Sequence, residues 1–120
     1  MGPEIEKKRR HKRAPLSAHV RLLVDEGART LILRGLIVEI SLSGAGLYLA
    51  QPPDVGAQVK LELSYLVASG EIKTETVGGT AIYSKYIHDT YFVGIEFDRE
   101  LDPKDQPDLY SRIQDILISY

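Results

Sequence analysis

The residue types best suited to binding chemistry gather near the start of the chain. Residues 9–13 read Arg-Arg-His-Lys-Arg, so Arg9 and Arg13 stand four residues apart. A guanidinium group can donate two parallel hydrogen bonds to phosphate oxygens, and clustered cations attract polyanions such as nucleic acid or anionic lipid. The segment therefore suits a phosphate-bearing ligand, while a solvated basic terminus without a partner stays open as an alternative.

A second group of polar residues lies at a sharp corner between two predicted strands. Residues 39–44 read Glu-Ile-Ser-Leu-Ser-Gly. Serine hydroxyls close turns by hydrogen bonding to nearby backbone groups, and glycine relieves backbone strain at such places. An ordinary turn accounts for Ser41 and Gly44, and that role does not exclude contact with a ligand.

The remaining residues do not support catalysis. The chain has no cysteine, which excludes disulfides, thiolate metal sites and cysteine nucleophiles. The histidines His11, His19 and His88 lie far apart without metal-ligand spacing, and neither Ser41 nor Ser43 has a candidate base nearby in the sequence. We therefore expect a binding protein that is not an enzyme, with no metal and no cofactor.

Charge is distributed unevenly along the chain, although the formal net charge is only −2. Residues 1–13 hold six Lys/Arg and two acids, a net of +4, whereas residues 14–120 hold nine Lys/Arg and fifteen acids, a net of −6. This asymmetry predicts a basic arm on an acidic body. The apolar runs are too short to span a membrane, so we expect a cytoplasmic protein that does not bind to a membrane.

The rest of the chain up to residue 97 has the alternating pattern of half-buried β-strands. We predict strands over residues 20–25, 31–40, 47–49 and onward, 59–63, 71–86 and 91–97. Glycines inside two of these segments predict a bend or bulge at Gly35 and an interruption at Gly78-Gly79.

The last segment changes to helical periodicity. Asp102 suits an N-cap, Pro103 the first helical position, and Pro107 would delay or kink the start. We place the helix at about residues 102–119. With six strands before it, the sequence predicts an all-β fold, a small six-stranded antiparallel barrel with one C-terminal helix, over residues 15–120. Residues 1–14 are expected to be a flexible arm.

The two polar groups, taken in order, resemble the PilZ domain, the bacterial receptor module for cyclic di-GMP. Its pattern is R-x-x-x-R followed some 20–30 residues later by D/N-x-S-x-x-G between two strands. Arg9 and Arg13 match the first motif, and Ser41 and Gly44 match the second. The run Val-Gly-Ile-Glu-Phe at residues 93–97 is similar to a late strand of the family. The resemblance covers roughly residues 8–118.

The resemblance implies a ligand site made by both motifs. The implied cyclic di-GMP ligands are Arg9, Arg13, Glu39, Ser41 and Gly44, with Lys8, Arg10 and Ser43 as accessory residues. In that pattern position 39 accepts hydrogen bonds from a guanine edge, Ser41 bonds to phosphate, and Gly44 allows a close backbone approach. One position departs from the pattern, because Glu39 stands where the family has Asp or Asn. Its carboxylate is one methylene further from the backbone.

The implied function is a signalling receptor and adaptor. Cyclic di-GMP would order the basic arm against the barrel and so change the surface that a protein effector, acting in trans, recognises. The apolar stripe of the terminal helix also leaves room for a homodimer. Two alternatives stay open: an interaction adaptor of the same fold that has lost nucleotide binding and, less favoured, a barrel that binds RNA through its basic arm.

Overall fold

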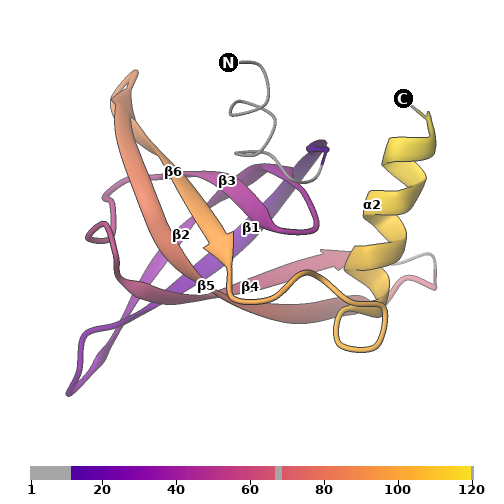
Figure 1. The fold of residues 1–120 in the computed structure, drawn as a ribbon, viewed down its shortest axis with the longest axis horizontal. Coiled ribbons are helices and arrows are strands. Elements are labelled where there is room, and N and C mark those ends of the chain that lie inside the picture. Colours follow the sequence, from indigo (N-terminus) through magenta and orange to yellow (C-terminus); the bar gives the residue numbers. More distant parts are fainter. Residues whose placement is uncertain (1–11, 67–68, 120) are drawn as a thin grey trace, which may run out of the picture.

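Six antiparallel strands form a ring with one helix beside it in the computed structural model, which describes residues 12–66 and 69–119 (Figure 1). The strands are β1 (Ala14–Asp25), β2 (Thr30–Ile40), β3 (Gly44–Leu49), β4 (Gln58–Leu66), β5 (Ile72–Ile87) and β6 (Thr90–Phe97), and the helix is α2 (Pro107–Ser119). Around the ring their order is β1-β2-β3-β6-β5-β4, with β4 returning to β1. The predicted fold class is confirmed.

The core fills the inside of the ring because alternate strand residues point inward. Val20, Leu22 and Val24 of β1 are buried, and the residues between them are exposed or half-buried. Leu109 and Ile113, one helical turn apart, are fully buried and attach α2 to the same core. The alternation read from the sequence therefore corresponds to an inner and an outer face of one sheet.

The strand irregularities differ from those predicted. β2 and β5 run without a break through Gly35 and through Gly78-Gly79, because both segments keep their ladder pairing there. The register shifts instead between Ile37 and Glu39 against β3, and between Ala81 and Tyr83 against β6. Both shifts lie beside the candidate site described below. A further shift lies between Pro15 and Ala18, in the register of β1 against β2.

The helix begins at Pro107 rather than at the predicted Asp102. Asp102 does act as a cap, but of a preceding turn, since its carboxylate accepts hydrogen bonds from the backbone N–H of Lys104 (2.6 Å) and Asp105 (3.4 Å). The helix itself is capped from β5. The Glu75 carboxylate accepts the N–H groups of residue 108 at 3.0 Å and of residue 109 at 2.8 Å.

The Glu75 carboxylate also accepts a hydrogen bond from the hydroxyl of Tyr65, at 2.7 Å. Partial burial, together with this hydrogen bond to a carboxylate, raises the pKa of Tyr65 well above its usual value of 10. The Arg112 guanidinium lies 5.0 Å from the Tyr65 ring centroid on the other side. Tyr65, Glu75 and Arg112 thus connect the β4–β5 hairpin to the helix.

Replacing Tyr65 by Phe should lower the free energy of unfolding by about 1.5–3 kcal/mol near neutral pH, the usual scale for a hydrogen bond to a charged group. The pKa of Tyr65 is higher in the folded than in the unfolded state. Its stabilisation is therefore complete below about pH 10 and declines as the pH rises further. Denaturant unfolding of both proteins from pH 7 to 11 measures the difference, and a difference that stays constant above pH 10 would contradict the assignment.

Candidate functional site

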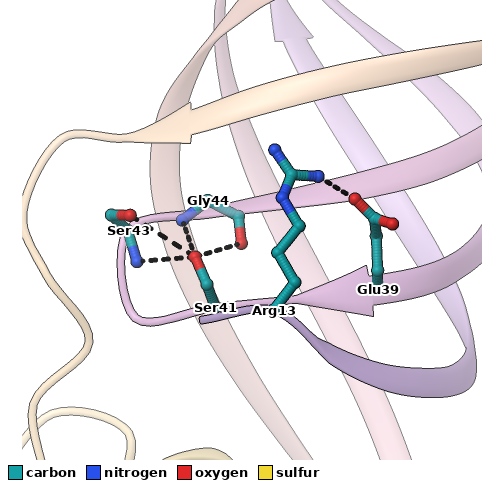
Figure 2. Close-up of polar contacts among 5 residues, drawn as sticks. All are labelled: Arg13, Glu39, Ser41, Ser43 and Gly44. Atoms are coloured by element: carbon teal, nitrogen blue, oxygen red, sulfur yellow. Dashed lines mark hydrogen bonds and ion pairs between the residues drawn. The ribbon is translucent and has the colours of Figure 1, made fainter. Parts of the chain in front are cut away.

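Two residues from separate motifs meet at one corner of the ring. Arg13, directly before β1, forms an ion pair with Glu39, near the end of β2 (Figure 2). Their side chains are 28% and 30% exposed, so the pair is accessible from solvent. The contact follows from strand pairing, because Pro15 lies opposite Glu39 in the β1–β2 ladder. The arginine motif and the corner motif are therefore adjacent in space.

Ser41 forms the corner between β2 and β3 and is only 4% exposed. Its hydroxyl oxygen accepts hydrogen bonds from the backbone N–H of Ser43 at 3.1 Å and of Gly44 at 3.2 Å, as Figure 2 shows. The Ser41 N–H in turn donates to the Gly44 carbonyl at 2.8 Å. In this structure the hydroxyl closes the turn, and the half-buried Ser43 hydroxyl lies 3.4 Å away.

Gly44 is required by the neighbouring strand. A Cβ atom at this position would lie 2.6 Å from the backbone oxygen of Ile95 in β6. No real Cβ approaches a backbone atom so closely, so any larger residue would push β3 away from β6. Gly44 thus makes a close backbone approach to another strand of the same chain, and the approach to a ligand that the resemblance implies stays a prediction.

A row of residues crosses four strands beside this corner. Glu39 of β2 pairs with Gly46 of β3, Gly46 pairs with Gly94 of β6, and Gly94 pairs with Tyr83 of β5. The two residues in the middle of the row, Gly46 and Gly94, are glycines, so the row itself carries no side chains there. The row therefore forms a floor of glycine backbone, with a carboxylate at one end and an aromatic residue at the other, and neighbouring side chains cover the two glycines.

Aromatic rings lie over this floor. A Cβ on Gly46 would lie 2.6 Å from the Phe92 ring and 3.0 Å from Cγ of Glu39, and a Cβ on Gly94 would lie 2.3 Å from the Tyr83 ring. The Phe92 centroid is 6.2 Å from that of Tyr83 and 5.2 Å from that of Tyr48. We call Tyr48, Tyr83 and Phe92 the aromatic platform. All three rings keep some solvent exposure.

Sequence reasoning found this platform only in part. Three tyrosines of the predicted strands, Tyr83, Tyr86 and Tyr91, have side chains that could stack on a base, and strand packing is the simpler role for each. The structure separates them, since Tyr86 and Tyr91 pair with each other near the hairpin tip at 5.1 Å. No local pattern in the sequence marks Phe92 or Gly46 as part of the platform. The usable signal would have been Gly46 and Gly94 facing each other, which depends on the β3–β6 register.

Three of the residues implied by the resemblance, Lys8, Arg9 and Arg10, lie outside the described residues. Over residues 12–66 and 69–119, no group of three His, Asp or Glu side chains is arranged to hold a metal ion. No helix in the same residues is long and apolar enough to cross a membrane.

The site offers three kinds of recognition on one outer surface. Arg13 supplies a guanidinium for an anion, Glu39 supplies a carboxylate that accepts N–H hydrogen bonds, and the platform supplies ring faces for stacking. A planar heterocycle that carries N–H donors and is linked to an anionic group matches all three.

Comparisons with known proteins agree with this architecture. The family model of the PilZ domain matches residues 7–117. Among solved structures, the inhibitor of motility MotI/DgrA of Bacillus subtilis superimposes with a TM-score of 0.68 at 17% identity, and the match covers 92% of this chain. It covers only 52% of MotI, so the chain spans about half the length of that protein.

A second solved structure matches along nearly its whole length. The PilZ domain of YcgR from Escherichia coli, described with c-di-GMP, superimposes with a TM-score of 0.62 at 18% identity, covering 93% of both chains. No curated protein sequence matches the chain. The family match extends over nearly all residues and includes both motifs and the late Val-Gly-Ile-Glu-Phe strand. The chain therefore belongs to the PilZ domain family.

Proposed function

We propose that the protein is a receptor for cyclic di-GMP that binds the dinucleotide on the outer surface formed by Arg13, Glu39 and the aromatic platform. The observation that carries the proposal is the ion pair between Arg13 and Glu39, because it brings the two sequence motifs into one accessible site. The PilZ domain of YcgR is described with the same ligand, which supports the choice of nucleotide.

Each group has a defined task in this proposal. Cyclic di-GMP carries two phosphodiester anions and two guanines. Arg13, joined by Arg9, binds a phosphate or a guanine O6/N7 edge with charge-assisted hydrogen bonds. Glu39 accepts from N1–H and N2–H of one guanine. The ring of Tyr83 stacks on a base and supplies contact area that no other part of the site offers.

The longer side chain of Glu39 adds a competition to this site. Arg13 forms an ion pair with the Glu39 carboxylate, so a phosphate must replace that carboxylate before Arg13 can bind the phosphate. The pair is only partly buried, so breaking it costs about 0.2–1 kcal/mol. Fixing the predicted basic arm, residues 1–14, over the ligand would add a further entropic cost. Both costs lower the affinity for the ligand, and a moderate affinity suits a reversible signal.

The signal itself would be read by another molecule. Nucleotide binding would fix the basic segment across the corner and present a new surface to a protein effector acting in trans, in the cytoplasm. One observation keeps a second function in view: the internal Arg13–Glu39 pair satisfies both residues without a ligand. An interaction adaptor that no longer binds nucleotide would have the same pair. Of the two, the receptor accounts better for the partial exposure of the platform rings.

Removing either arginine should weaken cyclic di-GMP binding. Each charge-assisted hydrogen bond contributes about 1.5–3 kcal/mol, so Arg9→Ala and Arg13→Ala should each raise Kd about ten- to hundredfold. Isothermal titration calorimetry measures this directly, with Arg29→Ala, an exposed arginine at the β1–β2 turn, as the matched control. If the wild-type protein gives no heat with the nucleotide, the adaptor without ligand is the correct function.

Shortening the carboxylate should strengthen binding. Glu39→Asp keeps the acceptor for guanine but withdraws it from Arg13, so the ligand no longer competes for that guanidinium. On the energy scale of an exposed ion pair, about 0.2–1 kcal/mol, Kd should fall about 1.4- to fivefold. Glu39→Ala, which also removes the guanine acceptor, should bind more weakly than wild type. Equal or weaker binding by Glu39→Asp would contradict the competition between Arg13 and the ligand.

The platform can be tested independently of charge. A stacked base contributes about 1–3 kcal/mol, so Tyr83→Ala should raise Kd about five- to hundredfold. The control is Tyr86→Ala, three residues later, which lies on the opposite face of the same strand and is 60% exposed. Equal affinities for the two variants would place the nucleotide away from the platform.

A further inference from the structure

The β1–β2 hairpin carries a strand edge without a neighbour. β2 begins at Thr30, but its ladder with β3 begins only at Gly35. Within the described part of the chain, residues 30–34 pair with β1 alone. Figure 1 shows this end of the hairpin projecting away from the ring. Alternate backbone N–H and C=O groups along this edge therefore point to where another strand could lie.

The edge is both ordered and partly apolar. The turn before it is closed by hydrogen bonds from the N–H of Glu26 to the carbonyl of Arg29 (3.0 Å) and from the N–H of Gly27 to the carboxylate of Asp25 (2.9 Å). Ile32, at the centre of the edge, is 46% exposed on the outer face. A strand edge that is already formed loses little conformational entropy when another strand pairs with it. The exposed isoleucine adds apolar surface that such pairing can bury.

Within one molecule, the two ends of the edge carry charges of opposite sign. Arg34 lies directly opposite Arg21 in the β1–β2 ladder, and like charges at opposed positions are destabilising. Arg21 has a partner in Glu62, at 3.3 Å. At the other end of the edge, Thr30 lies opposite Asp25. One end of the edge therefore has excess positive charge, and the other end has a carboxylate.

We propose that residues 30–34 pair antiparallel with the same edge of a second copy of this chain, with the two-fold axis at Ile32. In this register Ile32 faces Ile32 of the second copy, and Thr30 faces Arg34. An interface of this kind is isologous, so each favourable contact occurs twice. The two outer faces stay on the same side, which places the two isoleucine side chains next to each other.

The self-pairing also balances the charges. Arg34 of one copy lies across from Thr30 of the other, and Asp25 follows on the next strand of that copy. Two strand spacings are about 10 Å, which extended arginine and aspartate side chains can bridge. A foreign strand would need its own apolar and acidic residues at these positions. The antiparallel copy supplies both from the sequence already present, which is why we commit to a second copy.

The absence of cysteine from the chain allows a direct test of the register. In the full-length protein, Ile32→Cys should form a disulfide-linked dimer under mild oxidation, because residue 32 faces itself. Thr30→Cys and Arg34→Cys should each cross-link about tenfold more slowly alone, but rapidly when mixed together, because opposed cysteines come within disulfide distance. If Thr30→Cys alone cross-links as fast as Ile32→Cys, the proposed register is overturned.

The interface can also be tested without oxidation. Sedimentation equilibrium of the wild-type protein over a series of concentrations should give a reversible dimer. Ile32→Lys should weaken it at least about tenfold, because two ammonium groups then face each other across the axis. Val55→Lys, at a residue 65% exposed in the β3–β4 loop, is the matched control and should dimerise as wild type does. A wild-type protein that is monomeric throughout the series, or equal dimerisation by both variants, overturns the proposal.

Discussion

The close approach of β3 and β6 is the constraint on which the site depends. A Cβ at Gly44 would lie 2.6 Å from a backbone oxygen of β6, so this position admits only glycine. Further along the same ladder, Gly46 and Gly94 face each other and leave a strip of bare backbone on the outer surface. The rings of Phe92 and Tyr83 occupy that strip. The same small residues thus bring the strands together and make space for flat groups above them.

Electrostatics distinguishes this surface from the rest of the body. The acidic excess of residues 14–120 would repel a doubly anionic ligand at most positions, and Arg13 introduces a cation at the corner where the platform ends. Glu39 neutralises that cation in the ion pair, which limits non-specific attraction of other anions. Replacing the Glu39 carboxylate at Arg13 by a phosphate costs binding free energy. Only a ligand that also donates hydrogen bonds to that carboxylate regains this free energy, so the ion pair gives the proposed site selectivity and lowers its affinity.

Local patterns in the sequence predicted the parts of the structure that local physics determines. Strand alternation identified the strands at residues 20–25, 59–63 and 91–97, because inward and outward positions differ in burial at every second residue. The other three strands were identified from β-type or sufficiently long segments between turn residues. Contacts between distant residues were not predictable in this way. The helix start was missed because its cap, Glu75, lies more than 30 residues earlier in the chain. The role of Ser41 in the turn was anticipated, whereas the platform required the pairing of Gly46 with Gly94, which no local pattern encodes.

The two proposed surfaces share one strand without interfering with each other. Glu39 lies seven residues beyond Ile32 on β2, which corresponds to about 23 Å along an extended strand. A dimer formed about an axis at Ile32 would hold its two nucleotide sites roughly 45 Å apart, on strands that run in opposite directions. One cyclic dinucleotide could not bridge the two sites, so the number of ligands bound per chain does not depend on whether the dimer forms. If the cysteine variants do not cross-link in the expected pattern, the proposed nucleotide site is unaffected. If the protein forms the dimer but binds no nucleotide, the proposed pairing of residues 30–34 still holds.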